Sequence, residues 1–113
     1  MPEHITREDL RRRMETDEVT VVEATPSRFY EEQHLPGAIN IDHLDIAAEA
    51  PARLPDRSAP VVTYCDHLRC QNSSSAARRL EALGYTSVLE YAEGKDDWVA
   101  AGLPTEAGPE PAA

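Results

Sequence analysis

The chain has 113 residues, of which 41% are hydrophobic, and its formal net charge is −10 at pH 7. This length suits one domain with a modest core, and the negative charge argues against nucleic acids and anionic membranes as partners, because both would repel the chain. No stretch resembles a transmembrane span, and the polar first fifteen residues lack the apolar core of a signal peptide. We therefore expect a cytoplasmic protein whose two cysteines stay reduced.

The first half of the chain predicts helices and strands in alternation. Thr6 and Asp9 resemble a capping box in front of a helix with a thin apolar face. Residues 19–24 are β-branched with little polar alternation, which is typical of a strand covered on both faces. The predicted elements are a helix after Thr6, a strand at residues 19–24, a short helix at 27–33, a strand after the Pro36-Gly37 turn, and a helix at 42–54 interrupted by Pro51.

The second half continues the same alternation. Residues 59–64 form a β-branched and aromatic run entered through a proline, which predicts a buried strand. A helix follows, with Asn72, Ser73 or Ser74 as its N-cap and Gly84 at its C-cap. The alternation indicates a mostly parallel sheet with helices on both faces. The remaining predicted elements are a helix at 73–83, a strand at 86–91, a helix at 96–101 centred on Trp98, and a disordered tail at 105–113.

Cys65 directly follows a predicted strand and enters a loop that ends at a helix N-terminus. In open α/β sheets ligands bind at such places, because backbone amides and the positive end of the helix converge there. The same field favours a thiolate over a thiol. Asp66 would raise the pKa of Cys65 by like-charge repulsion, whereas Arg69, a protonated His67 and the helix would lower it. The sequence leaves the outcome of this competition open.

Four motifs, in the right order and spacing, resemble the rhodanese-homology family. The match runs from about Ile5 to Pro104, which is nearly the whole chain. The motifs are Val21-Val22-Glu23-Ala24 for the first core strand, Gln33-His34-Leu35-Pro36-Gly37-Ala38-Ile39-Asn40 for the family's Gly-His-Ile-Pro-Gly-Ala-Ile-Asn, Val62-Thr63-Tyr64-Cys65 with Ala76-Ala77 for the active cysteine and its helix, and Gly94 through Trp98 to Pro104 for the closing motif.

The resemblance implies a three-layer α/β/α sandwich on a five-stranded, mostly parallel sheet, in a single domain at residues 1–104. It also implies a sulfurtransferase that moves a sulfane sulfur from thiosulfate or another donor through a persulfide on Cys65 to cyanide or a thiol. A protein thiol is a further acceptor, and neither a cofactor nor a metal is needed. A loop of inward-pointing amides can hold a persulfide anion without a basic side chain. The loop residues expected to bind the substrate are Asp66, His67, Leu68, Arg69, Cys70 and Gln71.

The chain also departs from the family pattern. The loop has no glycine and is two residues longer than the commonest form, and it resembles a variant with a second cysteine five positions after the first, here Cys70. Glu23, Thr25 and Glu93 stand where the family usually has Asp, Arg and Gly. These departures keep a second function open, namely a non-catalytic or redox-sensing rhodanese-like module that binds a partner.

Several residues have structural alternatives. Cys70 is either a packing residue at the helix entry or a resolving thiol. Arg69 is either a thiosulfate-binding cation or an exposed loop charge. His34 is expected to be structural, as a hydrogen-bonding residue of a turn.

Two other chemistries of the cysteine loop are disfavoured. A zinc site from Cys65, His67 and Cys70 lacks the second ligand cluster that structural zinc sites have. A cysteine phosphatase or arsenate reductase needs an arginine six positions after the cysteine to clamp an oxyanion, and that position is Gln71.

Overall fold

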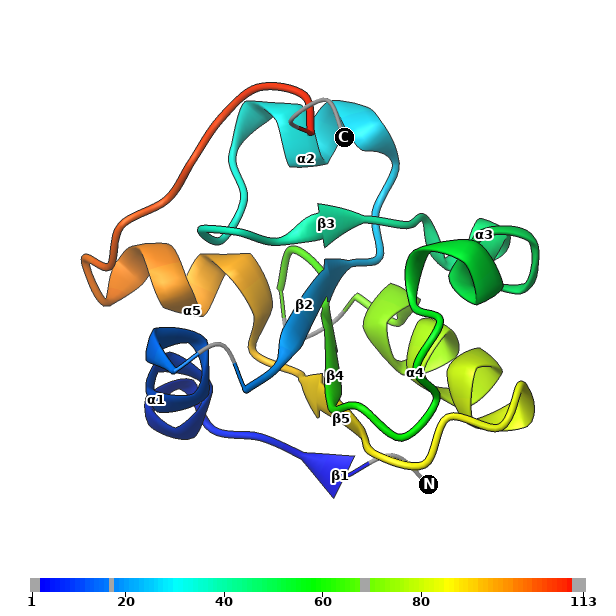
Figure 1. Cartoon of the computed structure of the whole chain (residues 1–113). Coiled ribbons are helices and arrows are strands. Elements are labelled where there is room, and N and C mark those ends of the chain that lie inside the picture. Colours follow the sequence, from blue (N-terminus) through cyan, green and yellow to red (C-terminus); the bar gives the residue numbers. More distant parts are fainter. Residues whose placement is uncertain (1–2, 17, 68–69, 111–113) are drawn as a thin grey trace.

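The sheet is parallel throughout the part of the chain that the computed structural model describes, namely residues 3–16, 18–67 and 70–110. Within those residues it has five strands in the order β1-β5-β4-β2-β3, and helices cover both faces (Figure 1). The predicted α/β/α sandwich is confirmed. The strands are β1 (Glu3–His4), β2 (Thr20–Glu23), β3 (Ile39–Asn40), β4 (Val61–Tyr64) and β5 (Val88–Tyr91), and the helices are α1 (Arg7–Glu15), α2 (Ser27–Glu32), the 3-10 helix η1 (His43–Asp45), α3 (Ile46–Arg53), α4 (Asn72–Ala82) and α5 (Gly94–Ala100).

Two apolar clusters fill the space between the sheet and its helices. On β2, Val22 joins the cluster that α3 and α4 cover, whereas Val21 joins the cluster that α1, α2 and α5 cover. Val61 and Val62 divide between the two clusters in the same way on β4. Each buried valine stabilises the fold by about 1.5–3 kcal/mol. Burial on both faces explains why these strands show no polar alternation. Trp98, on which the last predicted helix is centred, lies in the core.

Two helix ends follow the chemistry that their sequence predicts. The N–H of Asp9 donates to Thr6 Oγ1 at 3.2 Å, so the predicted N-cap of α1 is confirmed. At the end of α4, Gly84 has a φ of +99°, and the N–H of Tyr85 donates to the carbonyl of Leu80 at 3.1 Å. This is the closing hydrogen bond of a Schellman motif, in which only glycine takes the left-handed conformation easily.

Three helix boundaries differ from the prediction. Helix α4 begins after Gln71, which makes no side-chain cap hydrogen bond, so none of the three predicted caps, Asn72, Ser73 and Ser74, is the cap. Helix α3 continues through Pro51 to Arg53, because the burial of Ile46 and Ala50 in the core offsets the cost of a proline in the helix. Helix α5 begins at Gly94, earlier than predicted, because the backbone there is held by the cysteine loop.

The edge strand β1 has no signal in the sequence. It consists of two exposed residues, Glu3 and His4, which pair with Leu89 and Glu90 of β5. The N–H of Ile5 continues the ladder by donating to the Glu90 carbonyl at 3.0 Å. Pairing with an existing strand therefore creates this element, rather than local propensity.

The turn before β3 is fixed by aromatic residues. The His34 ring stacks on Tyr30 with ring centroids 3.7 Å apart, and its Nδ1 lies 2.7 Å from the Tyr30 carbonyl oxygen. The N–H of Leu35 donates to the Tyr64 hydroxyl at 3.1 Å. The predicted structural role of His34 is confirmed.

The segment from Thr105 to Glu110 lies beside α2 and β3 (Figure 1), although the sequence predicts disorder there. Glu106 and His34 exchange two backbone hydrogen bonds of 2.8 Å, and the Glu110 carboxylate accepts a hydrogen bond from Arg53. The composition of this segment gave no sign of order, because its partners are distant in sequence and compensate for the lack of apolar side chains.

Residues 111–113, the end of the predicted tail, lie outside the described residues. The domain boundary at residue 104 stays a prediction. Among the helices of the described ranges, none is both long and apolar enough to cross a membrane.

Candidate functional site

Cys65 follows the last residue of β4, which lies between β2 and β5 in the sheet. The loop that it opens is tied to the start of α5. The Cys65 carbonyl accepts a hydrogen bond from the Lys95 N–H at 2.8 Å, and the Asp66 carbonyl accepts one from the Asp96 N–H at 2.7 Å. The sequence therefore places the cysteine at the carboxyl edge of the sheet, and helix α5 fixes the backbone around it.

Gly94 allows this close approach of the two segments. Its φ is +70°, and a Cβ built on it would lie 2.4 Å from the Cys65 carbonyl oxygen and 3.1 Å from the His67 nitrogen. Contacts that short leave no room for a side chain. A glycine at position 94 is therefore needed for the cysteine loop to pack against the start of α5.

The Cys65 thiol is enclosed by hydrogen-bond acceptors. Its Sγ lies 3.4 Å from the Cys70 carbonyl oxygen, 3.6 Å from Ser73 Oγ and 4.0 Å from the His67 carbonyl oxygen. The side chain is fully buried. Burial is the main reason why the pKa of the Cys65 thiol rises to about 12. Loss of hydration thus outweighs the field of the helix and loop, which decides the competition that the sequence left open in favour of the thiol.

The other loop residues predicted to bind a substrate are only partly brought together. Asp66 is turned toward Lys95, with 3.3 Å between its Oδ1 and the ammonium nitrogen. Cys70 is a partly buried free thiol whose carbonyl faces Cys65. His67 and Gln71 are exposed. The two remaining predictions, Leu68 and Arg69, lie outside the described residues.

A buried ion pair between Lys95 and Glu23 lies next to the cysteine loop. Lys95 Nζ lies 3.1 Å from Glu23 Oε2 and donates to the Phe29 carbonyl at 3.0 Å. The Tyr64 hydroxyl donates to the other Glu23 oxygen at 2.7 Å, and the Thr25 hydroxyl also donates to this carboxylate. Glu23 is fully buried, so the pair satisfies an otherwise costly charge. The departures from the family pattern at residues 23 and 25 thus belong to one network.

Sequence reasoning missed two polar residues that hydrogen bonds connect to Cys65. Ser73 was interpreted as a helix cap, but it is fully buried and donates a hydrogen bond to Glu90 Oε2 at 2.7 Å. Glu90 lies in β5 and is only 6% exposed. A glutamate between Leu89 and Tyr91 of the predicted strand was the available signal, because buried carboxylates usually have a specific partner.

A cavity of about 540 Å³ opens beside the loop. Its charged lining is mostly acidic, since Glu32, Asp66 and Asp96 accompany a Lys95 that is already paired. Such a lining opposes the approach of a dianion such as thiosulfate, so donors close to the sulfur must provide the attraction.

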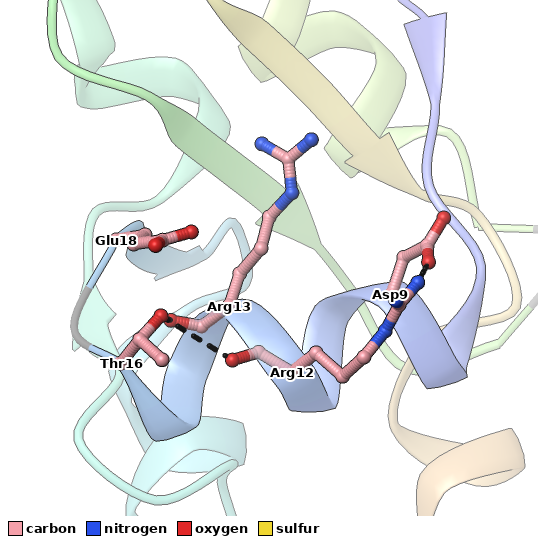
Figure 2. A pocket seen from close by; sticks show the side chains of 5 residues that line it. All are labelled: Asp9, Arg12, Arg13, Thr16 and Glu18. Carbon is pink, nitrogen blue, oxygen red and sulfur yellow. Dashed lines mark hydrogen bonds and ion pairs between the residues drawn. The ribbon is translucent and has the colours of Figure 1, made fainter.

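A second pocket, of about 470 Å³, lies at the end of α1 (Figure 2). The Arg12 side chain there turns back to pair with Asp9, and Arg13 and Glu18 extend over the opposite side. This pocket is at the amino end of β2 and therefore at the edge of the sheet opposite Cys65. The described ranges contain no group of three or more His, Cys, Asp or Glu side chains arranged to hold a metal ion.

Comparisons with known proteins find relatives of this chain. The model of the family described as "Rhodanese-like domain" matches residues 6–101. The HTH-type transcriptional regulator Rv0324 of Mycobacterium tuberculosis is 36% identical over 104 residues, which cover 92% of this chain and 45% of the regulator. The chain thus spans less than half the length of that relative.

Solved structures are similar as well. A thiosulfate sulfurtransferase from Pseudomonas aeruginosa superposes with a TM-score of 0.85 at 25% identity, over 94% of this chain and 20% of the other. A rhodanese with anions from E. coli superposes with a TM-score of 0.67 at 29% identity, over 80% of this chain and 99% of the other.

Proposed function

Because the chain belongs to the rhodanese-like domain family, we propose that it is a sulfurtransferase in which Cys65 carries a sulfane sulfur as a persulfide. The observation that carries the proposal is the position of Cys65, at the carboxyl end of a central strand and beside the first turn of α4. Ligands of parallel α/β folds bind at this edge. The donor is thiosulfate or another small sulfane-sulfur compound, and the acceptor is cyanide, a small thiol or a protein thiol.

The first half-reaction loads the cysteine. The Cys65 thiolate attacks the outer sulfur of thiosulfate, a new S–S bond forms, and sulfite leaves with the electron pair of the broken bond. In the second half-reaction the acceptor attacks the outer sulfur and Cys65 leaves as thiolate. No cofactor takes part in either step.

The resting loop suits a thiol better than a persulfide. Two of the groups around Sγ are carbonyl oxygens, from His67 and Cys70, and carbonyls accept hydrogen bonds but cannot donate them. A persulfide carries negative charge and needs donors. Loading therefore requires loop amides or hydroxyls to replace at least one of these carbonyls.

Intact-mass measurement after incubation with thiosulfate tests the proposal. We expect the mass of one added sulfur atom, located in the peptide that contains Cys65. Cys65→Ala should abolish the addition and Cys70→Ala, the matched control, should retain it. A labile sulfur on Cys70 that persists in Cys65→Ala would overturn the assignment.

A second candidate function is a sulfur- or redox-sensing module. It is supported by the similarity to a transcriptional regulator and by a second free thiol, Cys70, whose carbonyl oxygen lies 3.4 Å from Cys65 Sγ. Turnover separates the two functions. A sulfurtransferase keeps producing thiocyanate from thiosulfate and cyanide, whereas a sensing module takes up a single sulfur, or forms a Cys65–Cys70 disulfide with an oxidant, and then stops.

A further inference from the structure

A row of hydrogen-bonding groups leads from Cys65 to the surface through Ser73 and Glu90. The thiol faces Ser73 Oγ at 3.6 Å, and the serine hydroxyl donates to Glu90 Oε2 at 2.7 Å. The other carboxylate oxygen, Oε1, lies 3.3 Å from His4 Nε2, and the His4 side chain is 68% exposed. Three segments that are distant in sequence, β1, α4 and β5, therefore meet in one row.

Ser73 is held rigidly in the middle of this row. It is fully buried in the first turn of α4, and its carbonyl accepts a hydrogen bond of 2.8 Å from the Thr63 hydroxyl. Thr63 pairs with Glu90 in the register between β4 and β5, so both side chains rise from the same face of the sheet. The geometry of the row is thus built by backbone pairing.

The direction of these hydrogen bonds depends on the ionisation of Cys65. A serine hydroxyl has one proton, and in the resting state it is donated to Glu90. Ser73 can then only accept a hydrogen bond from the thiol. If Cys65 were a thiolate, it would face a lone pair of Ser73 unless the hydroxyl proton turned toward the sulfur. Glu90 would then lose the hydrogen bond from Ser73, and it could restore that bond only by carrying a proton and donating it to Ser73 Oγ.

We propose that Glu90 receives the proton of Cys65 through the Ser73 hydroxyl when the cysteine loads a sulfur. The inference rests on the proposed function, and it assigns Glu90 and Ser73 as residues that ionise the nucleophile. As the Cys65 S–H bond breaks, its proton passes to Ser73 Oγ, and the former hydroxyl proton of Ser73 passes to Glu90 Oε2. The products are a Cys65 thiolate, a neutral Ser73 and a protonated Glu90, so charge and protons balance.

This proton transfer from Cys65 through Ser73 to Glu90, called the relay below, explains how a buried thiol can become a nucleophile. A thiol whose pKa is about 12 is almost entirely protonated at neutral pH, so attack on a sulfur donor needs a base. After the transfer each hydrogen bond of the row is kept with its direction reversed, and Ser73 donates to the thiolate. The exposed His4, on the other carboxylate oxygen of Glu90, lies at the solvent end of the row.

The surrounding charges leave Glu90 as the base on this side of the sheet. His4 from β1 faces Glu90, and Cys70 faces Cys65 from the loop before α4. Asp66 is paired with Lys95, on the other side of Cys65. Among the described residues, Glu90 is the carboxylate that hydrogen bonds connect to the Cys65 thiol through Ser73.

Alkylation of Cys65 by iodoacetamide tests the relay without any sulfur donor. Cys70→Ala is used as the background, so that only Cys65 reacts. At neutral pH, Ser73→Ala should react at least about ten-fold more slowly than the background protein, within the range of general acid–base effects. Ser73→Thr keeps the hydroxyl and should restore the rate, and Ser74→Ala is the matched control on the same helix. The difference should shrink as the pH rises and hydroxide takes the proton.

Glu90→Gln separates a relay from simple electrostatics. Removing a nearby negative charge alone would lower the pKa of Cys65 and speed alkylation at neutral pH. Loss of the proton acceptor instead slows it by about ten-fold or more. Glu81→Gln makes the same charge change on the exposed surface of α4 and should react like the background protein.

The location of the proton gives a direct readout. At mildly alkaline pH, where sulfite stays unprotonated, sulfur loading of the wild type should release little acid and should produce the infrared carbonyl band of a protonated carboxylic acid. Glu90→Gln should release a full proton equivalent and lack the band. If Glu90 had only a structural role, the wild type and Glu90→Gln would release the same amount of acid and would not differ in this infrared band.

The outcomes distinguish the relay from the proposed function. Alkylation rates that follow the relay in a protein that takes no sulfur from any donor would reject the function and keep the relay. Normal sulfur loading, with wild-type alkylation rates in both Ser73→Ala and Glu90→Gln, would reject the relay and keep the function.

Discussion

Replacing Gly94 with alanine is expected to destabilise the protein by about 2–6 kcal/mol and to displace the cysteine loop. The added methyl group would lie 2.4 Å from the Cys65 carbonyl oxygen, which is backbone and cannot turn away. A left-handed conformation at a non-glycine residue costs about 1–3 kcal/mol, and overpacking costs a further 1–3 kcal/mol. Urea unfolding measures the first effect, and loss of sulfur loading on Cys65 measures the second.

Gly102→Ala is the matched control for this substitution. Gly102 has a similar φ of +75°, but a Cβ built there has no atom within 4 Å. It should therefore show the backbone strain, about 1–3 kcal/mol, without the clash. Equal destabilisation in the two variants, with sulfur loading retained in Gly94→Ala, would show that close packing against Gly94 does not hold the loop.

Lys95→Met should destabilise the protein by about 3–5 kcal/mol, since removing one partner of a buried ion pair leaves the other charge uncompensated. Glu23 is fully buried and would keep only its neutral donors, the hydroxyls of Tyr64 and Thr25. Asp66 would also lose its cation, so the loop beside Cys65 should loosen. Urea unfolding at neutral pH measures the change.

Two comparisons separate the effect of the unpaired buried charge on stability from the effect of altered packing. Adding Glu23→Gln to Lys95→Met should recover a large part of the lost stability, because a neutral amide replaces the unpaired carboxylate. Arg7→Met breaks the partly exposed pair of Arg7 with Asp97 and should cost much less than Lys95→Met, because solvent screens that pair. A double variant no more stable than Lys95→Met would mean that the lysine acts by packing, rather than by charge.

Local chemistry made much of the fold predictable. Runs of β-branched residues predicted β2 and β4. A strand that is buried on both faces has a continuous apolar run, which can be recognised without knowing which strands pair with it. The Thr6 cap and the Gly84 termination were predictable for the same reason, since caps are made within a few residues of the chain. The place of Cys65 after β4 followed from these assignments.

Other features depend on partners far away in sequence. The strand β1 exists because β5 offers it a free edge, and the segment around Glu106 is ordered because His34 offers backbone hydrogen bonds. Neither partner is visible in the local composition. The state of the Cys65 thiol is a third case, since a helix N-terminus favours the thiolate but full burial raises its pKa.

The sequence by itself determined the alternation of strands and helices, the family, and the position of the candidate nucleophile at the carboxyl edge of a parallel sheet. The tertiary structure alone decided that the thiol is enclosed and that Ser73, Glu90 and His4 stand in a row beside it. The physical reason is one of range. Propensities, caps and hydrophobic patterns act over a few residues, whereas desolvation and hydrogen-bond networks depend on which segments the folded chain brings into contact.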